Sequence, residues 1–166
     1  DSYLFWTFEP YNTIPAPQMQ ILERQFGSWL TAKYGSLDNA FKTWKQDPDF
    51  EPDQHGGDQP EAGRAGVLAA GSLFPQPSSR RAQDTAAFLT ENQQQFFEQA
   101  IRFLRQDMKY RGLIYASNWV TADARILGPL DKYSNTVGDF MDRHGYFDSS
   151  HKGDRASYSL NPGDTY

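Results

Sequence analysis

The sequence predicts an α/β protein in which parallel strands alternate with helices. Two apolar, β-prone runs, residues 113–116 and 139–146, each follow a stretch with helical spacing, and a third run, residues 3–8, comes first. Strands separated by helices are joined by right-handed crossovers and form a parallel sheet. In such sheets the binding and reacting residues gather beyond the carboxyl ends of the strands. The strand ends are therefore where a site is expected.

Composition and charge narrow the classes of function. The 166 residues are 38% hydrophobic and 15% aromatic, which suits one domain with a packed core. The net charge of -5 is spread over mixed-sign segments without a basic stripe, so nucleic-acid binding is not expected. There is no cysteine, hence no disulfide, thiolate metal site or cysteine nucleophile. No run approaches the roughly 18 apolar residues of a membrane-spanning helix, so no membrane partner is expected.

The first elements follow from local pattern. Residues 3–8 predict a short buried strand, and the three prolines of residues 10–17 predict a loop. Apolar residues then recur at three- and four-residue steps and predict a helix that ends before Gly35. They are Met19, Leu22, Phe26, Trp29 and Leu30. Ser36 is a candidate N-cap for a second, shorter helix.

Residues 46–80 predict an irregular excursion, because Pro, Gly and Asp dominate much of this stretch. Within it, Asp53, His55 and Asp58 form the one cluster that suggests a metal ion. Acidic residues on a glycine-rich loop are usually solvated, so we predict no metal there.

The remaining elements are a long helix, a strand, a short helix and a strand. Apolar residues from Leu89 to Met108 keep one face of the long helix, which is expected to stop by Gly112. The run 113–116 then predicts a strand that ends at Asn118 and Trp119. Gly128 and Pro129 open a short helix, and the strand 139–146 follows.

The predicted strand ends carry side chains that suit a carbohydrate site. Flat aromatic faces stack on the C–H faces of sugar rings, while amide and imidazole groups hydrogen-bond the hydroxyls. The residues at or near the three ends are Trp6, Glu9, Asn118, Trp119, His144 and Tyr146. A single tryptophan at a strand end is more often a packing residue. The prediction of a carbohydrate site therefore depends on all of these residues lying together at successive strand ends.

Two of these strand ends resemble a known family. The stretches ASNW (116–119) and DRHGYF (142–147) resemble the ends of the fifth and sixth strands of the clan A glycoside hydrolases, (β/α)8 barrels that include cellulases, mannanases and β-galactosidases. A His-X-Tyr after strand six recurs in that clan. The stretch 26–44 also resembles the segment after strand four in β-galactosidase-like members. The resemblance implies that residues 1–166 are one segment of a TIM-barrel catalytic domain, from the end of strand four to just after strand six.

The resemblance implies a retaining glycoside hydrolase that acts on a β-linked poly- or oligosaccharide through two glutamates and no cofactor or metal. It places both glutamates outside this chain, and since a whole barrel needs about 250 residues, the remainder is expected in the same or another chain. Extracellular or periplasmic use would suit such an enzyme, although the sequence itself leaves the compartment undetermined.

The resemblance also implies supporting roles for individual residues. Tyr146 would hydrogen-bond the nucleophilic glutamate, and His144 would support the acid/base or bind a hydroxyl. The implied substrate-binding residues are Asn118, Trp119, Trp6 and Phe147.

Three alternatives stay open. If the chain were complete, Glu9 would be the first acid/base candidate, although Pro10 and its offset from the strand end count against it. A second alternative is a non-catalytic carbohydrate-binding or scaffolding protein. A third is a self-contained helical protein that associates through FFEQAIRFLRQDM, residues 96–108.

Overall fold

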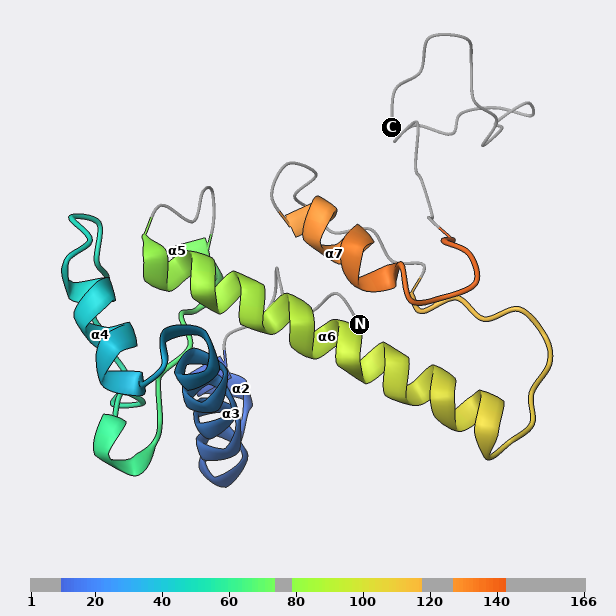
Figure 1. Cartoon of the computed structure of the whole chain (residues 1–166), viewed down its shortest axis with the longest axis horizontal. Helices are drawn as coiled ribbons and strands as arrows, with labels where there is room; N and C mark the ends of the chain where they lie inside the picture. Colours follow the sequence, from blue (N-terminus) through green and yellow to red (C-terminus); the bar gives the residue numbers. More distant parts are fainter. Residues whose placement is uncertain (1–9, 74–78, 118–126, 143–166) are drawn as a thin grey trace, which may run out of the picture.

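The computed structural model describes residues 10–73, 79–117 and 127–142, and within these ranges the regular elements are helices (Figure 1). The elements are α2 (Pro10–Thr13), α3 (Ala16–Tyr34), α4 (Leu37–Lys45), the short 3-10 helix η1 (Pro60–Ala62), α5 (Ala70–Leu73), α6 (Arg80–Gln106) and α7 (Leu127–Asn135). One antiparallel bridge, between Gln59 and Arg64, is the only β pairing in the described part of the chain.

The predicted α/β class is therefore wrong, and so is the resemblance to a middle portion of a (β/α)8 barrel, because the described ranges contain no sheet. The run 113–116 does not form a strand. Ile114 instead exchanges hydrogen bonds with Asp139, whose main-chain N–H donates to the Ile114 carbonyl at 2.8 Å. A β-prone sequence needs a partner strand, and this run packs beside α6 without one. The other two predicted strands lie wholly or partly outside the described residues.

The helices α3 and α4 form where the spacing of apolar residues predicts them, and their ends have local causes. Pro17 occupies the first turn of α3, where its missing N–H costs no helical hydrogen bond. Gly35 ends α3 with φ of 80°, a conformation that favours glycine. The Ser36 hydroxyl then accepts a hydrogen bond from the Asn39 N–H at 3.1 Å and caps α4.

An aromatic core joins α3 and α4 to the first half of α6. Phe26 stacks on Phe88 with ring centroids 4.9 Å apart and contacts Trp44 at 5.9 Å. The buried carboxylate of Asp84 on α6 accepts hydrogen bonds from Lys33 Nζ at 2.6 Å and from Trp44 Nε1 at 2.7 Å. Three helices thus share one apolar cluster and are also joined by the hydrogen bonds to Asp84.

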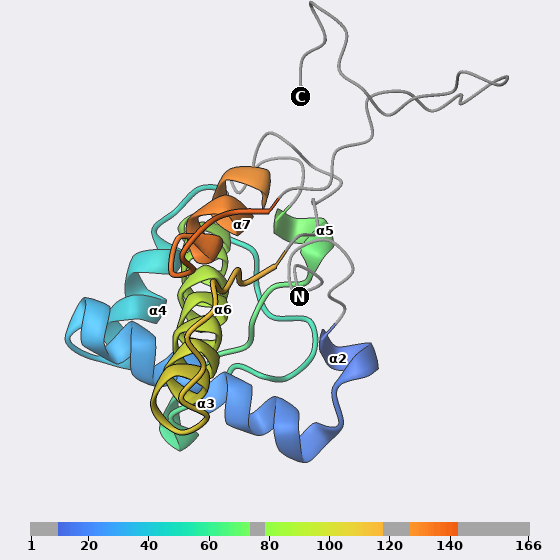
Figure 2. The same cartoon turned by 90° about the vertical axis from the view of Figure 1, so that its right-hand side faces the viewer.

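The long helix α6 runs past this core, so its second half lies away from α3 and α4 (Figure 1). In both views helix α7 lies beside α6, next to its middle part (Figure 1 and Figure 2). There Gln93 donates a hydrogen bond to the Ser134 hydroxyl at 2.7 Å. Near the end of α6, Arg105 binds the Gly112 carbonyl at 2.6 Å and the Asp139 carboxylate. None of the described helices is long and apolar enough to cross a membrane.

Candidate binding pocket

The residues that the sequence analysis singled out for catalysis and substrate binding all lie outside the described residues. They are Trp6, Glu9, Asn118, Trp119, His144, Tyr146 and Phe147. Their roles therefore stay predictions, and a candidate site in the described part of the chain has to be built from other side chains.

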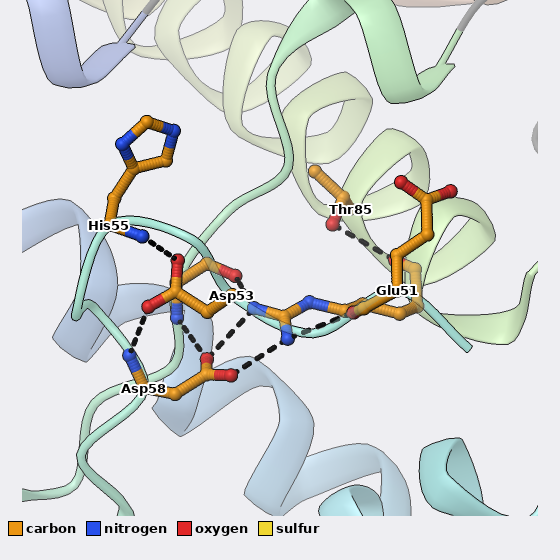
Figure 3. Close-up of polar contacts among 7 residues, drawn as sticks. Glu51, Asp53, His55, Asp58 and Thr85 are labelled. Carbon is orange, nitrogen blue, oxygen red and sulfur yellow. Dashed lines mark hydrogen bonds and ion pairs between the residues drawn. The ribbon is translucent and has the colours of Figure 1, made fainter.

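The described part of the predicted excursion is a folded loop that carries Asp53 and Asp58 (Figure 3). It is organised around Arg81, whose side chain is fully buried. The guanidinium donates two hydrogen bonds to the Asp58 carboxylate, from NH1 to Oδ2 at 2.7 Å and from NH2 to Oδ1 at 2.8 Å. It donates a third to the Gly66 carbonyl at 2.7 Å and lies over the Trp44 ring, with Cζ 5.0 Å from the centroid. This bidentate geometry fastens the loop to the first turn of α6.

Two carboxylates fix the course of the loop main chain. The Asp53 carboxylate accepts hydrogen bonds from the main-chain N–H groups of His55 and Asp58, each at 3.0 Å. Asp58 Oδ1 accepts one from the Gly66 N–H at 2.8 Å. The His55 ring points away from both carboxylates (Figure 3). Within the described ranges no group of three acidic or histidine side chains could hold a metal ion.

A cavity of about 280 Å³ lies between α2, α3 and this loop, and we call it the Tyr11 pocket. Its lining residues are Tyr11, Ile14, Ala16, Met19, Gln20, Glu23, His55, Gly56, Gln59 and Arg64. Tyr11 and His55 stack with ring centroids 4.3 Å apart and planes inclined by 14°. The volume lies just below the range of about 300–1,000 Å³ for ligand sites in proteins, so the cavity suits one small molecule.

The pocket holds a largely buried ion pair. Glu23 on α3 is 3% exposed, and its Oε2 lies 2.9 Å from NH1 of Arg64. Burial raises the pKa of Glu23, and the nearby Arg64 guanidinium only partly opposes this rise. Arg64 also contacts the Gln59 side chain, which orients its guanidinium at the cavity wall.

The Tyr11 hydroxyl is buried at the same wall and makes no hydrogen bond of good geometry. Burial raises the pKa of Tyr11, and the negative charges of Asp53 and Glu23 raise it further, so the phenol is neutral at physiological pH. A side chain at Gly66 would meet this hydroxyl at 2.8 Å, and one at Gly57 would collide with it. The two glycines thus leave room for the phenol beside Glu23.

The sequence pattern does not predict this pocket, although it contains one signal for it. Glu23 occupies a core-facing position on α3, in step with Met19, Phe26 and Leu30. A charged residue on the apolar face of a helix is seldom buried without a partner. The partner, Arg64, is 41 residues away and cannot be found from local spacing.

No family model matches the sequence, and comparison with curated proteins and with solved structures finds no match. Functional inference therefore rests on the residues and the geometry of the chain itself. Chemically, the Tyr11 pocket offers a carboxylate that accepts hydrogen bonds, a guanidinium that donates them and a phenol that can do either.

Proposed function

We propose that the protein binds a carbohydrate and holds one sugar ring in the Tyr11 pocket. The observation that carries this proposal is the buried Glu23–Arg64 pair beside the Tyr11 hydroxyl, which interacts with the Glu23 carboxylate but makes no hydrogen bond of good geometry. A buried hydroxyl in a poorly aligned contact lacks a full hydrogen bond, and a ligand hydroxyl in the cavity would supply one.

The lining of the pocket matches the surface of a sugar. Each sugar hydroxyl both donates and accepts, so it can bridge the Glu23 carboxylate and the Arg64 guanidinium. The apolar side chains of Ile14 and Met19 offer contact for the C–H face of the ring. The Tyr11–His55 stack adds a flat aromatic edge at the opening.

Titration of the protein with a panel of neutral mono- and oligosaccharides, followed by NMR chemical shifts and calorimetry, tests the proposal. We expect His55→Ala to weaken binding about tenfold, which corresponds to roughly 1.4 kcal/mol. The matched control is Gln54→Ala, an exposed neighbour on the same loop that does not line the pocket. Absence of binding to the whole panel, or equal weakening by both variants, would contradict the proposal.

Hydrolysis of a β-linked saccharide stays a prediction, because it depends on residues outside the described ranges. Release of a chromophore from aryl β-glycosides tests it directly. Sugar binding without turnover would favour the non-catalytic alternative, and turnover that depends on Tyr146 would favour the enzyme.

A further inference from the structure

The second half of α6 presents an apolar stripe that no described element covers. Phe96 and Phe103 are 63% and 54% exposed, and Ala100 lies between them on the same face of the helix. Residues at positions i, i+4 and i+7 form one continuous row along a helix. In the first half of α6 the apolar face is buried under α3 and α4, so the stripe extends beyond the core that covers it.

An apolar groove of about 380 Å³ lies beside this stripe, between α6 and residues 114–116. It is lined by Phe96, Phe97, Ala100, Ile101, Leu104, Ile114, Tyr115 and Ala116. Tyr115, itself 42% exposed, contacts Phe140 edge to face with centroids 5.4 Å apart. The stripe and the groove form one surface, which we call the α6 face.

We propose that the α6 face joins two copies of this chain. The exposed fractions of Phe96, Phe103, Tyr115 and Phe140 add up to about two whole aromatic side chains. At ~200 Å² for each, this is about 400 Å² of apolar surface on one copy. A standard interface buries about 800 Å² per partner, of which about 450 Å² is apolar. The face is therefore of the size that a stable dimer needs.

The residues along the stripe suit a two-fold pairing of α6 with itself. In an antiparallel arrangement with Phe96 opposite Phe103 of the second copy, the two-fold axis passes between Gln99 and Ala100, where a small side chain allows close approach. The same register sets Asn92 opposite Asp107 of the second copy, an amide donor facing a carboxylate. No like charges meet along this row.

Sedimentation and light scattering across a dilution series measure the oligomeric state. We expect a dimer for the wild-type chain and a monomer for the double variant Phe96→Glu with Phe103→Glu. Ile21→Glu is the matched control, because Ile21 is 53% exposed but lies on α3, outside the α6 face. Circular dichroism checks that each variant remains helical.

Crosslinking provides a second readout with little effect on folding. The chain contains no cysteine, so Ala100→Cys introduces a single thiol near the proposed axis. We expect it to form a disulfide-linked dimer on mild oxidation, whereas Glu98→Cys, on the opposite side of the helix, should not.

A wild-type chain that stays monomeric at the highest concentration would overturn the proposal. If this monomer also fails to bind a hydrophobic dye, another segment of its own chain covers the face. If it binds the dye, the face serves a different partner. Equal crosslinking of the two cysteine variants would likewise overturn it.

Discussion

Replacement of Arg81 by methionine tests whether one side chain holds the loop in place. The variant keeps most of the volume of the side chain but removes two hydrogen bonds to Asp58 and one each to the Gly66 and Glu51 carbonyls. Asp58, whose side chain is 21% exposed, would lose its counter-charge. Breaking a buried ion pair costs about 3–5 kcal/mol. Because Asp58 keeps some contact with water, we expect a loss at the lower end, about 3 kcal/mol.

Urea unfolding followed by tryptophan fluorescence measures this loss. In a chain of 150–250 residues each kcal/mol lowers Tm by roughly 2–4 °C, so the melting temperature should fall by about 6–12 °C. Arg80→Met is the control, since Arg80 is exposed and its hydrogen bond to Asp47 comes from its main-chain N–H, which the variant keeps, and it should change stability by less than about 0.5 kcal/mol. If Arg81→Met costs no more than Arg80→Met, the account of the loop is refuted.

Two further predictions concern α3 and the start of α6. Gly27→Ala should destabilise the protein by about 1–3 kcal/mol, although alanine is the better helix former, because the new methyl group would collide with the Gly63 carbonyl oxygen. Main-chain N–H groups at the start of α6 and at Asp49 hold the pKa of Asp47 below its ordinary 3.8. Asp47→Asn should therefore be less stable than the wild type at neutral pH, and this difference should vanish as pH falls through the lowered pKa.

Each of these predictions has a neighbouring control. Ser28→Ala also leaves an alanine in α3, one residue from Gly27, but it only removes an exposed hydroxyl and should be close to neutral; equal losses would show that the contact with Gly63 is unimportant. For Asp47, thermal melts of the wild type, Asp47→Asn and Asp49→Asn between neutral pH and about pH 2 cover the titration. A deficit of Asp47→Asn that persists unchanged at the acid end would contradict the lowered pKa.

The longer helices α3, α4 and α6 could be predicted from sequence because their signals are local, whereas the short α2 formed in a stretch predicted to be a loop. The spacing from Met19 to Leu30, the left-handed Gly35 and the capping Ser36 all lie within a few residues of the elements they define. Each signal acts on the main chain next to it, so no knowledge of distant contacts is required.

The strands could not be predicted in the same way, because a strand exists only with a partner. Residues 113–116 have the composition of a buried strand, but composition does not say whether another strand lies beside them. Here the Asp139 carboxylate accepts a hydrogen bond from the Ile114 N–H at 2.8 Å, and one main-chain hydrogen bond runs in the other direction. These two hydrogen bonds hold the segment in place, although it forms no β-ladder with another strand.

The candidate pocket depends on pairs that are far apart in sequence. Glu23 and Arg64 come from a helix and from a glycine-rich loop, and no periodicity connects them. A site at the strand ends follows from the α/β class, and because that class is wrong, it gives no guide to this pocket. Glu23 on the apolar face of α3 was the one available signal. It indicates that a buried partner exists but not which residue that partner is.

The energetics of Glu23 support a role in binding over a role in stability. Its pKa is raised by burial, so the folded chain takes up a proton that the unfolded chain releases, and stability falls as pH rises through that interval. A hydrophobic residue would complete the row formed by Met19, Phe26 and Leu30, and replacing buried ion pairs with apolar groups is often neutral or stabilising. A carboxylate kept at such a position has a cost in the free energy of folding. Beside the Tyr11 phenol and the cavity, the sugar binding that we propose would give this carboxylate a use, because a ligand hydroxyl could donate to it.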